Sequence, residues 1–122
     1  MKIFYILFFS VLFLGCQSLE RNAYRTIGTV AVGVDSAMNA WGDYVRAGMA
    51  TPQQEQIVKL AYTKYQTSME ACKVAVYIYK TSQASEKDFP QSALDALSKN
   101  ASDLVNIILK LLPDDAKKGV VQ

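Results

Sequence analysis

Two cysteines are the most reactive side chains in this sequence, which contains no histidine. The absence of histidine removes the usual general base, the Ser-His and Cys-His nucleophile pairs and the commonest metal ligand. Cys72 lies within an apolar helical pattern, where a free cysteine is commonly a small buried core residue with an inert thiol. A redox thiol is the competing interpretation of Cys72.

Acidic pairs offer no better catalytic centre. Asp114 and Asp115 follow an expected helix end, and Glu86 and Asp88 fall in an expected turn, so neither pair has a positioned acid, base or metal-ligand set beside it. The sequence also lacks a glycine-rich phosphate loop, a Cys-x-x-Cys pair and a nucleophile elbow. We therefore expect a protein that is not an enzyme and that uses no cofactor and no metal.

Cys16 ends an apolar N-terminal segment. One basic residue, Lys2, precedes an uncharged stretch from Ile3 to Gly15, which is shorter than the ~20 residues of a membrane-spanning helix. A basic start, a short apolar core and a small final residue are typical of a secretory signal peptide. An uncleaved anchor helix is the alternative for this segment.

The residues Leu12-Phe13-Leu14-Gly15-Cys16 resemble the lipobox of bacterial or phage-encoded lipoproteins. The resemblance is confined to residues 1–16. It implies removal of residues 1–15 and attachment of a diacylglycerol thioether, with acyl chains such as palmitate, to Cys16 as the first mature residue. Because Gln17 follows the cysteine, it also implies an outer-membrane site facing the periplasm, or the outer face of the cell membrane in a single-membrane host. A Cys16–Cys72 disulfide is the competing interpretation.

The apolar residues of the mature chain, 16–122, repeat at spacings of three and four, which predicts a single all-α domain. A helix is expected over about 18–47, with a seam formed by Ala23, Ile27, Val30, Val34, Ala37 and Trp41. The glycines and β-branched residues of 28–34 would also suit a strand. We favour a helix because the pattern continues on both sides, and Gly28 and Gly33 would then permit close helix approach or loosen this turn.

Helix-end signals divide the rest of the chain. Gly48 suits the left-handed position after a helix, and Thr51, Pro52 and Gln54 form a capping box. The second helix is expected over about 52–82, with an apolar arc of Ile57, Leu60, Ala61, Tyr65, Met69, Cys72, Ala75, Val76, Ile78 and Tyr79. The third is expected over about 90–112, with a stripe of Leu94, Leu97, Ala101, Leu104, Ile108 and Leu111, and residues 116–122 should fray.

The short connection between the first two helices requires them to lie antiparallel, so the predicted fold is an antiparallel three-helix bundle with up-down-up topology. Trp41 and Tyr44, three residues apart, would pack in its core or bind a ligand. Val74 and Tyr77 point away from the core of the second helix, and Ser85 and Phe89 lie in the following connection. These four residues are the candidate partner contacts.

The balance of charged residues argues against nucleic acid as a partner. The sequence has 13 basic and 11 acidic residues, and this balance argues against nucleic acid, which calls for a basic stripe or patch. We expect a lipid-anchored envelope protein that binds the membrane through Cys16 and an envelope or phage protein through a helix face. Such a non-catalytic interaction module would act in lysis, superinfection exclusion or secretion. The alternative is a structural or stress-related envelope lipoprotein that self-associates as a homo-oligomer and has no specific ligand.

Overall fold

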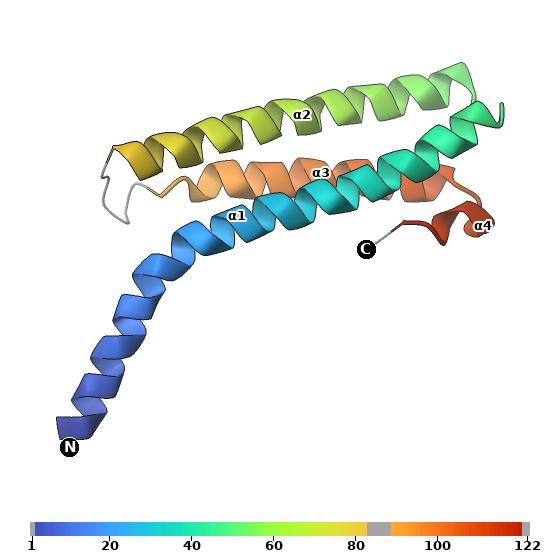
Figure 1. Ribbon diagram of the computed structural model, residues 1–122. Coiled ribbons are helices and arrows are strands. Elements are labelled where there is room, and N and C mark those ends of the chain that lie inside the picture. Colours follow the sequence, from blue (N-terminus) through green and yellow to red (C-terminus); the bar gives the residue numbers. More distant parts are fainter. Residues whose placement is uncertain (1, 83–88, 121–122) are drawn as a thin grey trace.

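The computed structural model describes the backbone of residues 2–82 and 89–120 and the side chains of residues 21–82 and 89–120. These residues form α1 (Lys2–Arg46), α2 (Pro52–Thr81), α3 (Gln91–Leu111) and the short α4 (Asp114–Lys117), with no strand among them. The three long helices pack together, with α2 running opposite to α1 and α3 (Figure 1). The prediction of an all-helical fold built from three long, packed helices is confirmed.

α1 is one helix from Lys2 to Arg46 and has no boundary near residue 18, where the sequence analysis placed its start. Its first half projects away from α2 and α3 (Figure 1). Residues 28–34 are helical, so the strand alternative is wrong. A β-carbon added at Gly28 or Gly33 would meet no neighbouring atom within 4 Å. The two glycines therefore do not bring another helix into close contact.

The turn between α1 and α2 follows its sequence signals closely. Gly48 has a φ of 74°, and its N–H donates to the carbonyl of Val45 at 2.9 Å, as expected for a glycine that ends a helix. The Thr51 hydroxyl accepts from the Gln54 N–H at 3.2 Å, and the Gln54 side chain accepts from the Thr51 N–H at 3.0 Å. The predicted capping box is confirmed, and it fixes the point at which the chain reverses.

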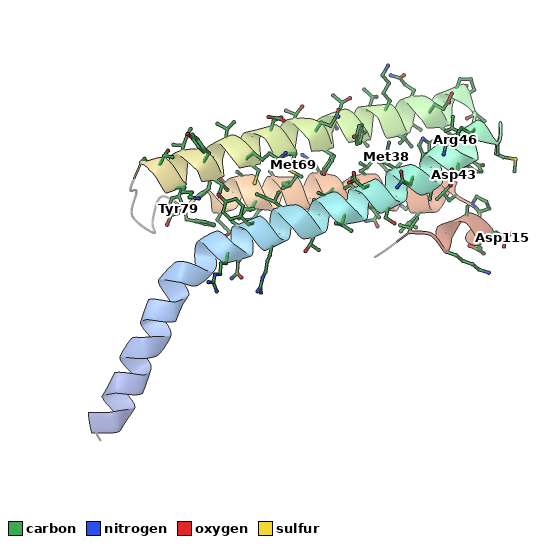
Figure 2. All side chains as sticks on the ribbon, in the orientation of Figure 1. Met38, Asp43, Arg46, Met69, Tyr79 and Asp115 are labelled. Atoms are coloured by element: carbon green, nitrogen blue, oxygen red, sulfur yellow. The ribbon has the colours of Figure 1, made fainter. Side chains whose placement is uncertain are left out.

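α3 packs against both α1 and α2, and the core lies among the three helices. Asn100 of α3 also donates from Nδ2 to the Ser68 hydroxyl of α2, which fixes the level of one helix against the other. Met69 projects from α2 into this space (Figure 2). The buried residues are Ala23, Val34, Ala37, Trp41, Val58, Tyr65, Met69, Cys72, Val76, Leu94, Leu97, Ala101, Leu104, Ile108 and Leu112.

α2 departs from the predicted core on one side. Ile57, Leu60 and Ile78 were expected inside, but they are 47%, 56% and 56% exposed, whereas the adjacent Val58 is buried. The apolar arc of α2 is wider than α1 and α3 together can cover, because each neighbouring helix covers only part of a helix surface. The arc therefore divides into a buried inner part and an exposed outer part.

The C-terminal segment is folded as far as residue 120, where fraying was expected, and residues 121 and 122 lie outside the described residues. Residues Asp114–Lys117 form α4, and the Ser36 hydroxyl of α1 donates to the carbonyl of Gly119 at 2.9 Å. Ala116 and Val120 also pack against the core. The segment folds back along α1 (Figure 1) because these apolar contacts cover part of α1 that α2 and α3 leave open.

Candidate interaction surface

Cys72 lies in the buried core of α2 and carries a free thiol. Burial raises the pKa of this thiol, because the charged thiolate is poorly solvated there. A protonated and inaccessible thiol is unreactive, so the core interpretation of Cys72 holds against the redox one. The side chain of Cys16 lies outside the described side chains.

The aromatic residues proposed as a ligand-binding pair belong to the core. Trp41 is buried, Tyr44 is half-buried, and their ring centroids are 5.5 Å apart in a tilted arrangement. Tyr65 is also buried, and burial raises the pKa of its hydroxyl, with smaller contributions from Asp35 and Tyr62. Trp41 and Tyr65 stabilise the packing between helices, whereas Tyr44 packs against the core and also lines the groove between α1 and the C-terminal segment.

The predicted partner contacts do not form one surface. Val74 and Tyr77 are 53% and 66% exposed on the outer side of α2. Phe89 is half-buried against the core, and its ring lies edge-on to Tyr79 with 5.1 Å between centroids. The expectation that these residues avoid the core is therefore wrong for Phe89. Ser85 lies outside the described residues.

The sequence analysis missed a longer apolar stripe on α2 that includes Val74. Successive steps of three and four residues connect a set that is exposed throughout, and we name this set the outer seam: Ile57, Leu60, Lys64, Thr67, Ala71, Val74 and Ile78. This 3-4 spacing is the repeat by which helices pair in coiled coils. The signal was present in the sequence as an arc too wide for one core, but Ile57, Leu60 and Ile78 were assigned to the inside, and Ala71 was assigned to neither side.

A groove of about 500 Å³ adjoins the first half of the outer seam, between α2 and α3. Its apolar part is formed by Ile57 and Leu60 of α2 and Ile107 of α3. Lysines line it as well, and one of them, Lys99, forms an ion pair of 3.1 Å with Asp103. The groove continues the apolar surface of the outer seam onto α3.

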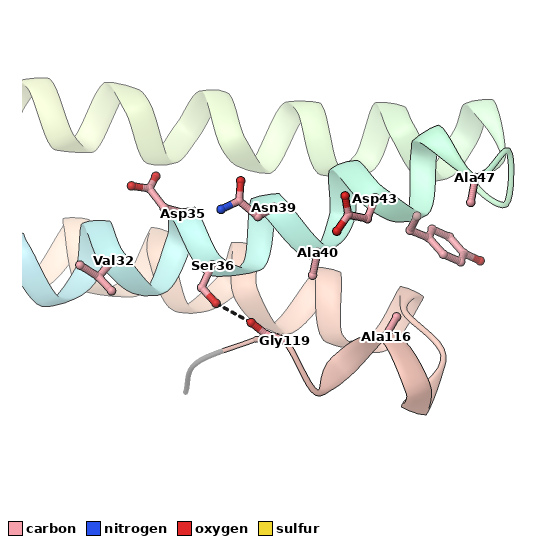
Figure 3. Close-up of a pocket in the computed structure, with 10 residues that line it drawn as sticks. Val32, Asp35, Ser36, Asn39, Ala40, Asp43, Ala47, Ala116 and Gly119 are labelled. Atoms are coloured by element: carbon pink, nitrogen blue, oxygen red, sulfur yellow. Dashed lines mark hydrogen bonds between the residues drawn. The ribbon is translucent and has the colours of Figure 1, made fainter.

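A second groove, of about 800 Å³, lies between α1 and the C-terminal segment (Figure 3). Asp35, Asn39 and Asp43 line it on successive turns of α1. Asp43 is paired with Arg46 near the turn, where Figure 2 shows the two side chains together. Among the described residues no three His, Cys, Asp or Glu side chains gather as a metal site.

Within the part of the chain that the structure describes, no helix combines the length and apolar character needed to cross a bilayer. Comparison with known proteins found no matching family model, curated protein or solved structure.

Proposed function

We propose that this protein is a lipid-anchored envelope protein that acts as a non-catalytic protein-interaction module at the membrane surface. The observation that carries the proposal is the outer side of α2, where Ile57, Leu60, Val74 and Ile78 of the outer seam are all exposed. Scattered exposed apolar side chains are ordinary, but an aligned set on one face is typical of a surface that binds a partner. A module of this kind fits a role in lysis, superinfection exclusion or secretion.

The lipid anchor in this proposal is attached to Cys16. The support for it is the resemblance of the residues before Cys16 to a lipobox. The backbone of α1 is helical from before Cys16 to Ala23, the first buried residue, and a helix rises 1.5 Å per residue. A lipid on Cys16 would therefore hold the core within roughly 10 Å, measured along α1, of the attachment point. Two or more acyl chains on one residue are enough for stable attachment, since a single chain binds only marginally.

The anchor is tested by Cys16→Ser in the full chain. The substitution should abolish labelling by a radioactive fatty acid and remove the protein from the membrane fraction. Labelling that persists in the variant contradicts lipid attachment at Cys16 and favours an uncleaved anchor helix.

The docking surface is tested by the double variant Val74→Asp with Tyr77→Ala. Neither side chain contributes to the core, so the circular-dichroism melt should change little while cross-linked partner is lost from the membrane fraction. Val32→Asp with Tyr24→Ala, two similarly exposed residues of α1, is the matched control. Loss of partner in both double variants, or in neither, contradicts a docking surface on α2.

A further inference from the structure

We infer that the partner of the outer seam is a second copy of this chain, with the two α2 helices packed antiparallel. The inference rests on the docking role proposed for α2, and it identifies the occupant of that surface. The outer seam spans Ile57 to Ile78, about 32 Å along the helix. It is covered by neither α1 nor α3, and its residues are exposed along its whole length.

The outer seam is self-complementary when it is reversed on itself. In an antiparallel pair, one layer combines Ile57 with the partner's Val74, and the next combines Leu60 with the partner's Ala71. The following layer combines Lys64 with the partner's Thr67. The twofold axis repeats each of these three pairs with the two protomers exchanged. Apolar residues therefore meet apolar residues in both outer layers, and Ile78 extends beyond them toward the level of the partner's Gln53. The polar layers lie in the middle, where the lysine stem can pack while its ammonium group reaches water. A twofold contact requires this kind of self-matching surface.

Charges beside the outer seam favour the same orientation. The antiparallel layers place Lys59 within about one helical turn of the partner's Glu70, twice in the dimer. A parallel pair in register would instead place Lys64 in the same layer as the partner's Lys64. Like charges at such positions disfavour pairing and opposite charges favour it. Both Lys59 and Glu70 are exposed and available for this contact.

α3 extends the contact. Its level against α2 is fixed by the Asn100–Ser68 hydrogen bond, and the same twofold axis therefore brings Lys110 to the level of the partner's Asp95. Ile107, which shares the groove with Ile57 and Leu60, adds apolar area beside the outer seam. A strip about 32 Å long and about 10 Å wide, counted on both protomers, amounts to about 640 Å², and α3 enlarges it toward the ~1,000 Å² of a small specific interface.

An interface of this size predicts a reversible dimer whose population depends on concentration. Confinement of two lipid-anchored copies to one membrane raises their effective concentration. The chain should therefore dimerise at the membrane more readily than in dilute solution. The relevant experiment uses the full-length protein in cells.

The first measurement places a photo-cross-linking amino acid at Val74 of the full-length chain and identifies the adduct by mass spectrometry. Adducts that contain only peptides of this chain support the dimer. Adducts that contain another protein overturn the dimer and leave the docking function of α2 standing. Absence of any adduct overturns both. Fatty-acid labelling of the same sample reports on the anchor separately.

The second measurement tests the orientation by disulfide formation under mild oxidation. The double variant L60C/A71C should give a covalent dimer, because these two positions share a layer, whereas L60C alone should not. A dimer formed by L60C alone overturns the antiparallel arrangement. The unsubstituted chain is the blank for its own two cysteines. Adding V74D to L60C/A71C should remove the dimer band, whereas adding V32D should leave it unchanged; equal loss with both substitutions overturns the assignment to the outer seam.

Discussion

The two sides of α2 have similar apolar residues and different environments. Val58, Met69 and Val76 on the inner side are buried against α1 and α3, whereas Ile57, Leu60 and Val74 on the outer side stay about half exposed. Both sides repeat at helical spacing, so neither composition nor periodicity distinguishes them. The difference comes from the number of neighbours: two helices cover one side of α2, and nothing in the part of the chain that the structure describes covers the other.

This comparison separates residues that stabilise the fold from residues that remain available for a partner. A substitution on the inner side should act on the free energy of unfolding. A substitution on the outer side should act on association and leave unfolding nearly unchanged. Pairs of nearby residues on opposite sides test the distinction directly, because their chemistry and position in the chain are closely matched.

The largest contrast is expected between Val76→Asp and Val74→Asp. Val76 is 1% exposed and Val74 is 53% exposed, two residues apart on the same helix. A buried carboxylate without a partner costs about 3 kcal/mol or more, so Val76→Asp should unfold the domain or lower its melting temperature sharply. Val74→Asp should leave the circular-dichroism melt almost unchanged. Similar melts for both variants would mean that the helical phase of α2 is wrong.

A smaller contrast is expected between Val58→Ala and Ile57→Ala, which are adjacent in the chain. Removing most of a fully buried valine side chain should cost about 1.5–2 kcal/mol in urea unfolding. Ile57→Ala removes a larger side chain from an exposed position, so it should cost less than about 0.5 kcal/mol. The larger deletion should thus have the smaller effect. The reverse order would place Ile57 in the core and leave the outer seam incomplete.

The capping box before α2 stabilises the whole helix and so contributes equally to its inner and outer sides. Thr51→Ala removes the hydroxyl that accepts from the Gln54 N–H and should cost about 1 kcal/mol. Thr63→Ala is the control, since its hydroxyl donates to the Lys59 carbonyl within the helix at an exposed position. Its effect should be close to zero. Equal losses for the two variants would mean that the capping box does not stabilise the start of α2.

The features that sequence predicted well are local ones. The glycine that ends α1 and the Thr51–Gln54 capping box depend on residues a few positions apart, and both were assigned correctly. Most of the predicted stripe on α3 is buried, because α3 contacts two helices, but Leu111 is half-buried and Leu112 is buried in its place. Cys72 and Trp41 were also assigned correctly to the core, because each lies in the apolar pattern of its own helix.

The errors arise where a distant segment decides the outcome. Ile57, Leu60 and Ile78 were assigned to the core because nothing local shows how much of α2 its neighbours cover. Phe89 was assigned to the surface, although it packs against Tyr79. The contact between Ser36 and Gly119 joins residues far apart in the chain, and neither segment carries a signal for the other.

The smallest effect near neutral pH is expected from the two titratable groups on the inner side of α2. Burial raises the pKa of Cys72 and of Tyr65, so the folded state keeps these protons at a pH where the unfolded chain loses them. Their contribution to stability is therefore complete at neutral pH. It declines above about pH 8.5, where the unfolded thiol ionises, and declines further where the unfolded phenol ionises. Urea unfolding measured between pH 7 and pH 11 should show this loss.

Substitutions at Cys72 and Asp35 test whether the loss of stability at alkaline pH comes from the inner side of α2. Cys72→Ala should lower stability at every pH but weaken the decline that begins first. Asp35→Asn should weaken the later decline, because its carboxylate contributes to the raised pKa of Tyr65. If Cys72→Ala and Asp35→Asn both leave the profile as steep as in the unsubstituted chain, the alkaline loss does not come from the inner side of α2, since burial raises the pKa of Cys72 and of Tyr65 there.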